Sequence, residues 1–555
     1  MFDRRRRRLR VQITGCATIQ KSHPLDEGGE QSACAAREAG QESRMPEKKL
    51  NRRQFARSLT AASGALAGGS LVAAEAGKRG DVAAISAPTR LLLPSAGNVP
   101  ESHAKHVRTA GFVSNDGRVF QESARNIPVA ESCDVVVCGG GPAGIAAALA
   151  SARSGAKTRL LEVNGCVGGV WTGGALSLII DSKGKPGIMA ELRGKLERRQ
   201  TGHWIGGSIV YDPESMKLML EEMLLEAGVE LRYHTRVVGA AVDRDKRLST
   251  VLTESKSGRE AWIAGSYIDC TGDGDLAAQA GCEYDLGHPV THALQPMSLM
   301  ALFTGAQTDD IARFTRGDAE PRKLGNPKVN FLEELRRAGV DPSYHGPTIF
   351  RIRDGLHALM ANHQYAQQAI DADHVTRATL QARREVHRLI DGLRAKGGIW
   401  KGVRVVATGE QIGTREGRRV RGLYHVDSDD LRKGSRFDDA ICRVNFGIDV
   451  HATKRDSNKA IEAKPFRAKP YDIPMRALIA RDVSGLMMAG RCISGDFFAH
   501  SSYRVTGDAV TMGEAAGVAS AVAVRKKTPP HELPYSTVAG KLADLRADAE
   551  KRAAG

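Results

Sequence analysis

The stretch from Cys133 to Gly144 constrains the fold more than any other part of this sequence. An apolar run, Cys133 to Cys138, leads directly into glycines 139, 141 and 144, and an alanine-rich run follows. In this pattern the first glycine permits a tight turn, the second lets backbone approach a pyrophosphate, and the third lets a helix pack on the strand. A second apolar run ends in Glu162, whose carboxylate is suited to accept hydrogen bonds from a ribose. The sequence therefore predicts a βαβ unit that binds a dinucleotide, in preference to a glycine-rich turn without a ligand.

Further glycine-rich segments indicate which dinucleotide is bound. Two glycine pairs, Gly168-Gly169 and Gly173-Gly174, leave a run of bare backbone that packs well only beneath a large flat ligand. FAD has such a part, since its isoalloxazine must also be covered, whereas NAD rarely needs this. Near the C-terminus, an apolar run ending at Gly490-Arg491 precedes a helix of small residues. FAD is thus favoured, and an NAD-linked enzyme is the alternative.

Several signatures in a fixed order carry a resemblance to a known family. They are Gly139–Gly144, Gly168-Gly169, Asp212–Glu214, Asp269–Asp275, Gln295–Ser298, Gln411–Glu416 with Arg418-Arg419, Arg436–Ala440, Tyr471–Pro474 and Ala489–Ser494. On these residues the chain resembles bacterial FAD-dependent oxidoreductases with a glutathione-reductase-like FAD fold. The resemblance implies an α/β protein with a Rossmann-like, three-layer FAD-binding domain that is discontinuous in sequence, with an inserted α+β substrate or cap domain. We expect FAD to be bound by Gly139, Gly141, Pro142, Ala143, Gly144, Glu162, Gly168, Gly169, Thr271, Gly272, Asp273, Gly490, Arg491, Gly507 and Gly513.

These signatures predict the organisation of the chain. We expect an unstructured extension at 1–44, with Met45 as the true start, an export signal at 45–76, and a linker and lead-in at 77–128. The FAD-binding domain is expected at 129–290 and 484–525, the inserted domain at 291–483, and a charged surface helix in the tail at 526–555.

The N-terminal region resembles a twin-arginine export signal. A basic segment with Arg52-Arg53 precedes an uncharged Ala/Gly-rich stretch and then Ala74-Glu-Ala76, a small-residue cleavage site. The stretch is too short and too rich in glycine for a membrane span. We expect a periplasmic or otherwise exported protein that engages twin-arginine export machinery, which carries folded, cofactor-loaded proteins. A chance arginine pair is the alternative, and a nucleic-acid-binding arm is the alternative for the arginine run at 4–8.

Composition argues against several other classes. Of the net charge of +16, residues 1–76 contribute +6 and the remaining 479 residues +10, without a long basic block interleaved with aromatics, so nucleic-acid binding is not expected. The nine cysteines form no CxxC or CxxCH, and no metal-ligand spacing is present. Cys166, beside a glycine pair, is more often a packing residue than a reactive thiol.

The predicted chemistry is substrate oxidation. A pyridine-nucleotide-dependent relative would carry a second GxGxxG, and none is seen at 291–480, so we expect hydride transfer from a small organic substrate to flavin N5. Reoxidation would use oxygen, a quinone or an electron-acceptor protein. The loop before the closing helix carries His500, Tyr503 and Arg504; we expect His500 to act as the base and Arg504 to pair with a carboxylate or the flavin edge. The alternatives are that Arg504 only braces the loop and that His500 only caps a turn.

Some alternatives stay open at this stage. The arginines at 415, 418 and 419 with Glu416 fit a domain-locking ion pair as well as a substrate contact, and His451 is an isolated histidine. Export and the absence of a nicotinamide site favour a hydroxylated substrate such as a sugar or polyol. A reductase of the fumarate-reductase kind, fed by a partner, and a flavin-holding scaffold without turnover are the alternative functions.

Overall fold

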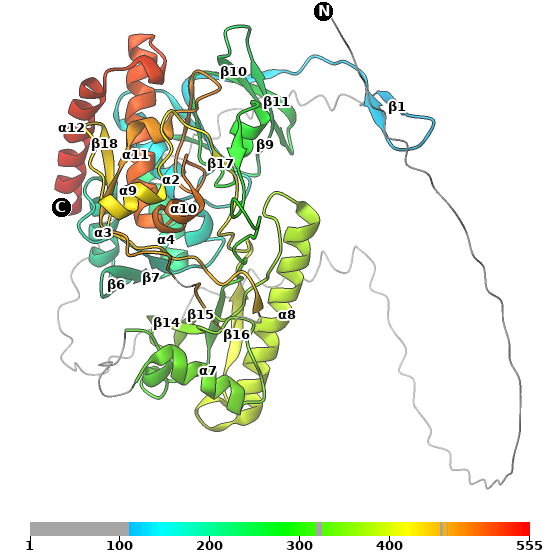
Figure 1. Ribbon diagram of the computed structural model, residues 1–555, viewed down its shortest axis with the longest axis vertical. Helices are drawn as coiled ribbons and strands as arrows, with labels where there is room; N and C mark the ends of the chain where they lie inside the picture. The colour runs from blue at the N-terminus through cyan, green and yellow to red at the C-terminus, as the bar shows by residue number, and fades with distance from the viewer. Residues whose placement is uncertain (1–109, 318–324, 456–458, 463, 555) are drawn as a thin grey trace, which may run out of the picture. The chain divides into compact units, whose positions relative to one another are not determined.

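The computed structural model describes residues 110–317, 325–455, 459–462 and 464–554 (Figure 1). The predicted extension, the export signal and the linker up to 109 lie outside these residues. Contacts along the chain place Ala96–Gly555 in one unit, which contains every described residue.

The central element is a seven-stranded sheet with the order β8-β4-β3-β11-β10-β9, to which β20 adds beside β11. The strands β8, β4, β3, β11 and β20 run parallel, whereas β10 pairs antiparallel with β11 and β9. This confirms the predicted Rossmann-like α/β fold, because β20 comes from the C-terminal part of the chain and completes a sheet begun more than 300 residues earlier. The strands are β3 Val129–Cys138, β4 Thr158–Leu161, β8 Glu230–Arg232, β9 Arg236–Val242, β10 Leu248–Ser255, β11 Gly258–Asp269 and β20 Leu486–Met488.

Two helices of small residues pack closely against this sheet. The α2 helix, Pro142–Arg153, and the α11 helix, Thr506–Lys526, are rich in alanine and glycine, which allows their backbones to approach each other. A Cβ added to Gly513 would stand 2.8 Å from the carbonyl carbon of Ala143, nearer than real Cβ atoms come. The helices that surround this core are α3 Ile188–Arg198, α4 Pro213–Glu226, α5 Asp275–Gln279, α9 Ser428–Lys433, α10 Phe497–Tyr503 and α12 Tyr535–Ala554.

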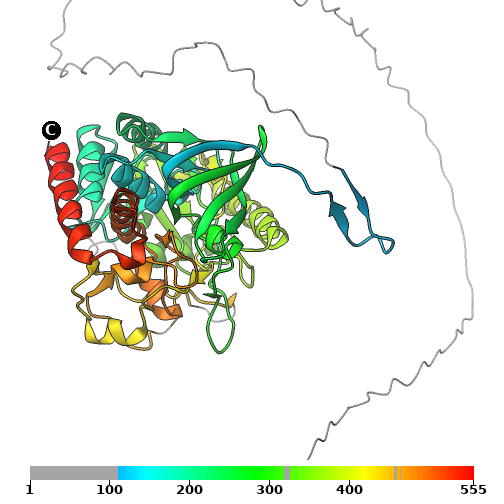
Figure 2. The same ribbon diagram turned by 90° about the horizontal axis from the view of Figure 1, so that it is seen from above.

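The C-terminal helix differs from the charged surface helix expected for the tail. In α12 the side chains of Val538, Leu542, Leu545 and Ala549 are buried, and this helix lies beside α3 (Figure 2). Their spacing of three and four residues places them on one helix face. The tail therefore contributes to the core of the FAD-binding part.

A second, smaller sheet with its own hydrophobic cores forms the inserted region. Its order is β14-β15-β13-β16, all antiparallel, and the long helix α8 runs along it (Figure 1). Its apolar clusters draw mainly on residues between Met297 and Ile412. The elements are β13 Ala301–Thr304, α7 Pro327–Arg337, β14 Thr348–Arg353, β15 Leu356–Met360, α8 Ala372–Lys396 and β16 Arg404–Thr408.

The predicted insertion at 291–483 is longer than the region, about 297–412, that has hydrophobic cores of its own. Residues from Val420 to Val483 contribute side chains to the same apolar core as the large sheet. The cause is the pair β18–β19, which packs on the FAD-binding side although it follows the insertion in sequence. The remaining strands are β1 Gly111–Val113, β2 Phe120–Glu122, β5 Leu178–Ile179, β6 Gly202–Ile205, β7 Ser208–Tyr211, β12 Tyr284–Asp285, β17 Arg419–Val420, β18 Ala440–Val444 and β19 Tyr471–Pro474.

Among the described residues, no helix combines the length and the apolar character that crossing a membrane requires.

Candidate active site

A cavity of about 970 Å³ lies where the parallel strands end. Its walls include the turns that follow β3, β4, β11 and β20, together with residues of the inserted region. In open α/β sheets, ligands bind outside the carboxyl ends of the strands. The N-terminal residues of α2 and α11 also line the cavity, so the positive ends of both helix dipoles lie at its wall.

The glycine-rich turn has the shape of a nucleotide cradle. A Cβ on Gly139 would stand 2.5 Å from the carbonyl oxygen of Cys270, and one on Gly144 would stand 2.9 Å from the carbonyl carbon of Gly139, so both glycines are required for close packing. A Cβ on Gly141, by contrast, would meet nothing within 4 Å. The turn is therefore tight on the protein side and open on the cavity side, which fits a pyrophosphate held at the N-terminus of α2.

Glu162 lies at the end of β4, lines the cavity and is 4% exposed. Its Oε2 accepts a hydrogen bond from Gly140 N at 2.6 Å, and its Oε1 accepts from Asn164 N and Asn164 Nδ2, both at 2.8 Å. A carboxylate has about four lone-pair sites. Three are used within the protein, which leaves one on Oε2 for a ribose hydroxyl of a bound nucleotide.

The structure divides the predicted cofactor residues into two groups. The first group lines the cavity and comprises Gly139, Gly141, Pro142, Ala143, Glu162, Gly169, Thr271, Gly272, Gly490 and Arg491. The second group lies behind that surface and supports it: Gly144, Gly168, Asp273, Gly507 and Gly513. Asp273, for example, accepts a hydrogen bond from Arg491 Nη1 at 2.6 Å and so holds a residue of the wall.

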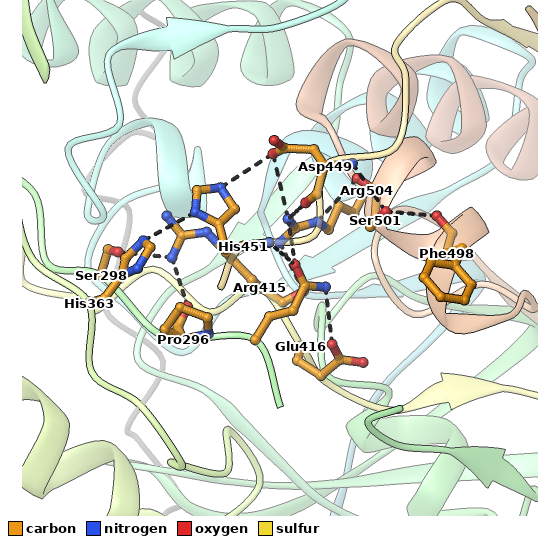
Figure 3. A network of polar contacts seen from close by, with 11 residues as sticks. Pro296, Ser298, His363, Arg415, Glu416, Asp449, His451, Phe498, Ser501 and Arg504 are labelled. Carbon is orange, nitrogen blue, oxygen red and sulfur yellow. Dashed lines mark hydrogen bonds and ion pairs between the residues drawn. The ribbon is translucent and has the colours of Figure 1, made fainter. Parts of the chain in front are cut away.

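The far end of the cavity carries a network of polar side chains (Figure 3). Arg415 Nη1 donates to Pro296 O at 2.7 Å and to Ser298 Oγ at 2.8 Å. Arg504 Nη2 donates to Asp449 O at 2.8 Å and to Gln295 Oε1 at 3.1 Å. Both arginines line the cavity, and burial lowers the pKa of each guanidinium, that of Arg504 to about 10.

His451 lies at the centre of this network and also lines the cavity. Its Nδ1 is 3.1 Å from Nε2 of His363, and its Nε2 is 3.3 Å from Asp449 Oδ2. Burial and the neighbouring Arg415 lower the pKa of His451 to about 3. The imidazole is therefore neutral near pH 7, while His451 and Arg504 hold the pKa of Asp449 well below its usual range and keep it ionised.

A chain of polar contacts leads from Asp449 through both histidines. Nε2 of His451 faces the ionised Asp449 carboxylate at 3.3 Å, and this contact is favourable when Nε2 carries the hydrogen and donates it. Nδ1 of the neutral imidazole then accepts from His363 Nε2 at 3.1 Å, and the Tyr365 hydroxyl lies 3.3 Å from His363 Nδ1. His451 and Asp449 thus form a hydrogen-bonded pair that lines the cavity.

Of the three predicted catalytic residues, only Arg504 lines the cavity. His500 is fully buried in α10, and burial lowers its pKa well below the usual value. Tyr503 is also buried and donates its hydroxyl hydrogen to Ile493 O at 3.0 Å. The structure therefore does not bring His500 or Tyr503 to the cavity, because the short helix turns both side chains into the core.

The sequence did not single out His451, Asp449 and His363 as a site. They come from loops separated by up to 88 residues, and only the preceding family signatures around Gln295 and Arg415 pointed to this region. Glu416 pairs with Arg419 inside the protein, so for these two residues the structure shows the ion pair and not a cavity contact. Cys166 is half-buried, with Sγ 3.7 Å from Thr172 Oγ1, and does not line the cavity.

Comparison with known families decides the identity. A family model described as FAD dependent oxidoreductase matches residues 134–542. The chain belongs to the FAD-dependent oxidoreductase family. It is accordingly a flavoenzyme whose cofactor is FAD, and the NAD-linked alternative is wrong. No curated protein matched the sequence.

Solved structures of similar fold are distant in sequence. One is a geranylgeranyl bacteriochlorophyll reductase-like protein from Thermoplasma acidophilum, at 14% identity and TM-score 0.41, covering 76% of this chain and 88% of that chain. Another is p-nitrophenol 4-monooxygenase from Pseudomonas putida, at 13% identity and TM-score 0.39, covering 76% and 86%. A third is the myxobacterial chondrochloren halogenase, at 14% identity and TM-score 0.39, covering 74% and 78%.

Proposed function

We propose that this enzyme oxidises a small organic substrate bound at the polar end of the cavity and passes a hydride to the flavin. The observation that carries the proposal is the continuity of the site: the nucleotide cradle at Gly141 and the network around His451 line the same cavity. FAD supplies the hydride-accepting chemistry, and the protein orients the substrate and handles its proton. In this proposal the FAD-binding part follows the glutathione-reductase-like arrangement, which the order of the glycine signatures supports.

The His451–Asp449 pair is the proposed proton acceptor. The pair would take up the proton of the substrate hydroxyl as the hydride leaves the adjacent carbon, and the imidazole and the carboxylate, 3.3 Å apart, would share it. Arg415 and Arg504 would position the substrate. Arg415 donates to neutral oxygens through Nη1 and keeps its other nitrogens for the substrate, whereas Arg504 donates to four oxygens and keeps one N–H on Nη1. General base catalysis of this kind contributes about 10²–10⁴-fold to a rate.

Anaerobic mixing of the FAD-loaded enzyme with candidate substrates tests this function. A substrate should bleach the flavin absorbance, and His451→Gln should retain FAD while the rate of bleaching falls at least a hundredfold. His500→Gln is the matched control, because it changes a buried histidine that does not line the cavity. If His500→Gln abolished bleaching in a folded, FAD-loaded enzyme and His451→Gln did not, the assignment of the base would be wrong.

The electron acceptor is proposed to be oxygen, a quinone or a protein carrier. Reoxidation of the bleached enzyme by each acceptor in turn distinguishes these. If no organic donor bleaches the flavin, but chemically reduced enzyme is reoxidised by an organic compound, the enzyme works as a reductase instead, as in the fumarate-reductase alternative.

We also propose export by the twin-arginine route to the periplasm. The support is the sequence around Arg52-Arg53, which lies outside the described residues. Replacement of both arginines by lysine should retain the FAD-loaded precursor in the cytoplasm of a host that has this machinery. Unchanged export of the Lys-Lys variant would contradict the proposal.

A further inference from the structure

The polar end of the cavity has an excess of positive charge. Arg316, Lys328, Arg415 and Arg504 all line it, and Asp449 is the carboxylate that faces them. Arg316 follows a short helical turn of the inserted region, and Lys328 lies in the first turn of α7. Of the described residues that line this end of the cavity, four are thus cationic and one, Asp449, is anionic, which leaves a net charge of +3 on the wall.

The pairing of these four side chains is incomplete within the described residues. Arg316 and Lys328 form no ion pair there, and the guanidinium of Arg316 lies 6.0 Å from the centre of the Phe350 ring. Arg415 donates only to the neutral oxygens of Pro296 and Ser298. Arg504 approaches Asp449 Oδ2 only to 3.8 Å.

Within the described ranges, Asp449 is the one ion-pair partner of these four cations, and close like charges with so little compensation are unfavourable. Burial lowers the pKa of all four groups, and the repulsion of Arg316 lowers that of Lys328 further. Partly desolvated charges are stable when an opposite charge compensates them. The pyrophosphate of FAD does not provide it here, because the cradle for that group lies at Gly141 and the N-terminus of α2, on the wall formed by the large sheet.

We propose that the substrate is a small organic dianion, with one anionic group bound by Arg415 and Arg504 beside His451 and the other by Arg316 and Lys328 at the start of α7. This deepens the proposed function, on which it rests. The four side chains would each gain a charge-assisted hydrogen bond, and the positive end of the α7 dipole would favour the second anionic group. The reacting C–H and O–H would lie next to the first anionic group, as in a hydroxylated dicarboxylate.

Such a substrate would also activate the base. Burial and Arg415 are the two largest causes of the low pKa of His451. An anionic group on Arg415 would offset the second cause and raise the pKa of His451 toward neutrality, where the His451–Asp449 pair accepts a proton more readily. The base would then become effective only when the correct substrate is bound.

Binding of dicarboxylates to the oxidised, FAD-loaded enzyme tests the proposal without any turnover. The probes are malonate, succinate, glutarate and adipate, compared with butyrate and the neutral polyol erythritol, and the readout is the change in the flavin spectrum together with calorimetry. At least one dicarboxylate should bind tenfold or more tighter than butyrate, and erythritol should not bind measurably. Equal binding of butyrate and of every dicarboxylate would overturn the proposal.

Variants of the second pair provide the decisive control. Arg316→Gln with Lys328→Gln should weaken binding of the best dicarboxylate about a hundredfold, about tenfold or 1.4 kcal/mol for each cation, and leave butyrate binding unchanged. Arg313→Gln with Lys401→Gln removes the same charge from two exposed residues of the inserted region that do not line the cavity, and should have little effect. Equal weakening by both pairs would show a general charge effect and refute the site.

The outcomes separate this inference from the proposed function. Flavin bleaching by a neutral polyol, with no dicarboxylate binding, would support substrate oxidation and refute the dianion. Tight dicarboxylate binding that depends on Arg316 and Lys328, with no bleaching by any organic donor, would support the anion site and contradict the proposed oxidation.

Discussion

The close approach of α11 to α2 allows a quantitative test of how the FAD cavity is built. Gly513→Ala would place a Cβ 2.8 Å from the carbonyl carbon of Ala143, and nearer still to its oxygen, in a fully buried contact. Because the obstacle is backbone, the two helices must separate. Overpacking of this kind costs about 1–3 kcal/mol. The replacement of a helical glycine by alanine offsets about 1 kcal/mol of that cost.

Gly540→Ala is the matched control for this prediction. Gly540 also lies within a helix, but it is exposed and a Cβ there would meet nothing within 4 Å. This variant should be stabilised by up to about 1 kcal/mol. The free energy of unfolding of Gly513→Ala should therefore lie about 1–3 kcal/mol below that of Gly540→Ala, the difference being the overpacking cost.

The assay combines denaturant unfolding, followed by circular dichroism, with titration of FAD into the cofactor-free proteins. Ala143 lines the cavity, so displacement of α2 should weaken FAD binding by Gly513→Ala about tenfold (about 1.4 kcal/mol) and leave Gly540→Ala unaffected. If both variants matched in stability and in FAD affinity, the close helix packing would not shape the cavity as described.

Three further predictions concern buried polar groups. Burial lowers the pKa of His357 to about 4. As the pH falls below about 6.5, the unfolded chain therefore binds a proton that the folded chain does not, and stability is lost. His357→Phe should remove about 2 kcal/mol of the stability loss between pH 8 and pH 5, and an unchanged loss in denaturant titrations would contradict this. Glu162→Gln should weaken FAD binding at least tenfold, because the amide cannot accept at both oxygen positions; unaltered affinity in a fluorescence titration would refute the role of the carboxylate. Lys185→Met should lower the free energy of unfolding by about 3–5 kcal/mol, because it leaves the buried Asp508 without its ion-pair partner at 2.5 Å. Adding Asp508→Leu to this variant should recover part of the loss, and additive losses in unfolding experiments would argue against the pairing.

Local patterns in the sequence predicted the FAD-binding part well. The glycines at 139 and 144 have local steric reasons to be glycine, and Gly141 keeps the cavity side of the turn open, so their spacing reports directly on the turn that they form. The return of the chain to the large sheet through β20 was predicted from the Gly490-Arg491 signature, since that segment must pass the cofactor.

The substrate end could not be predicted in the same way. His451, His363 and Arg415 meet through loops, where side-chain direction depends on tertiary packing and follows no helical or strand period. His500 and Arg504 illustrate the difficulty, because they lie four residues apart at the end of α10, yet one is enclosed in the core and the other reaches the cavity. Proximity in sequence to the cofactor motif was a guide to the region but not to the residues.

A crystal structure of the FAD-loaded enzyme would test the central claim most directly, because it locates the flavin ring. We predict that the ring occupies the cavity between the glycine-rich turn and the polar network, with Arg415 and His451 at the face where the substrate binds. A flavin ring bound elsewhere, with Arg415 and His451 remote from it, would contradict the account.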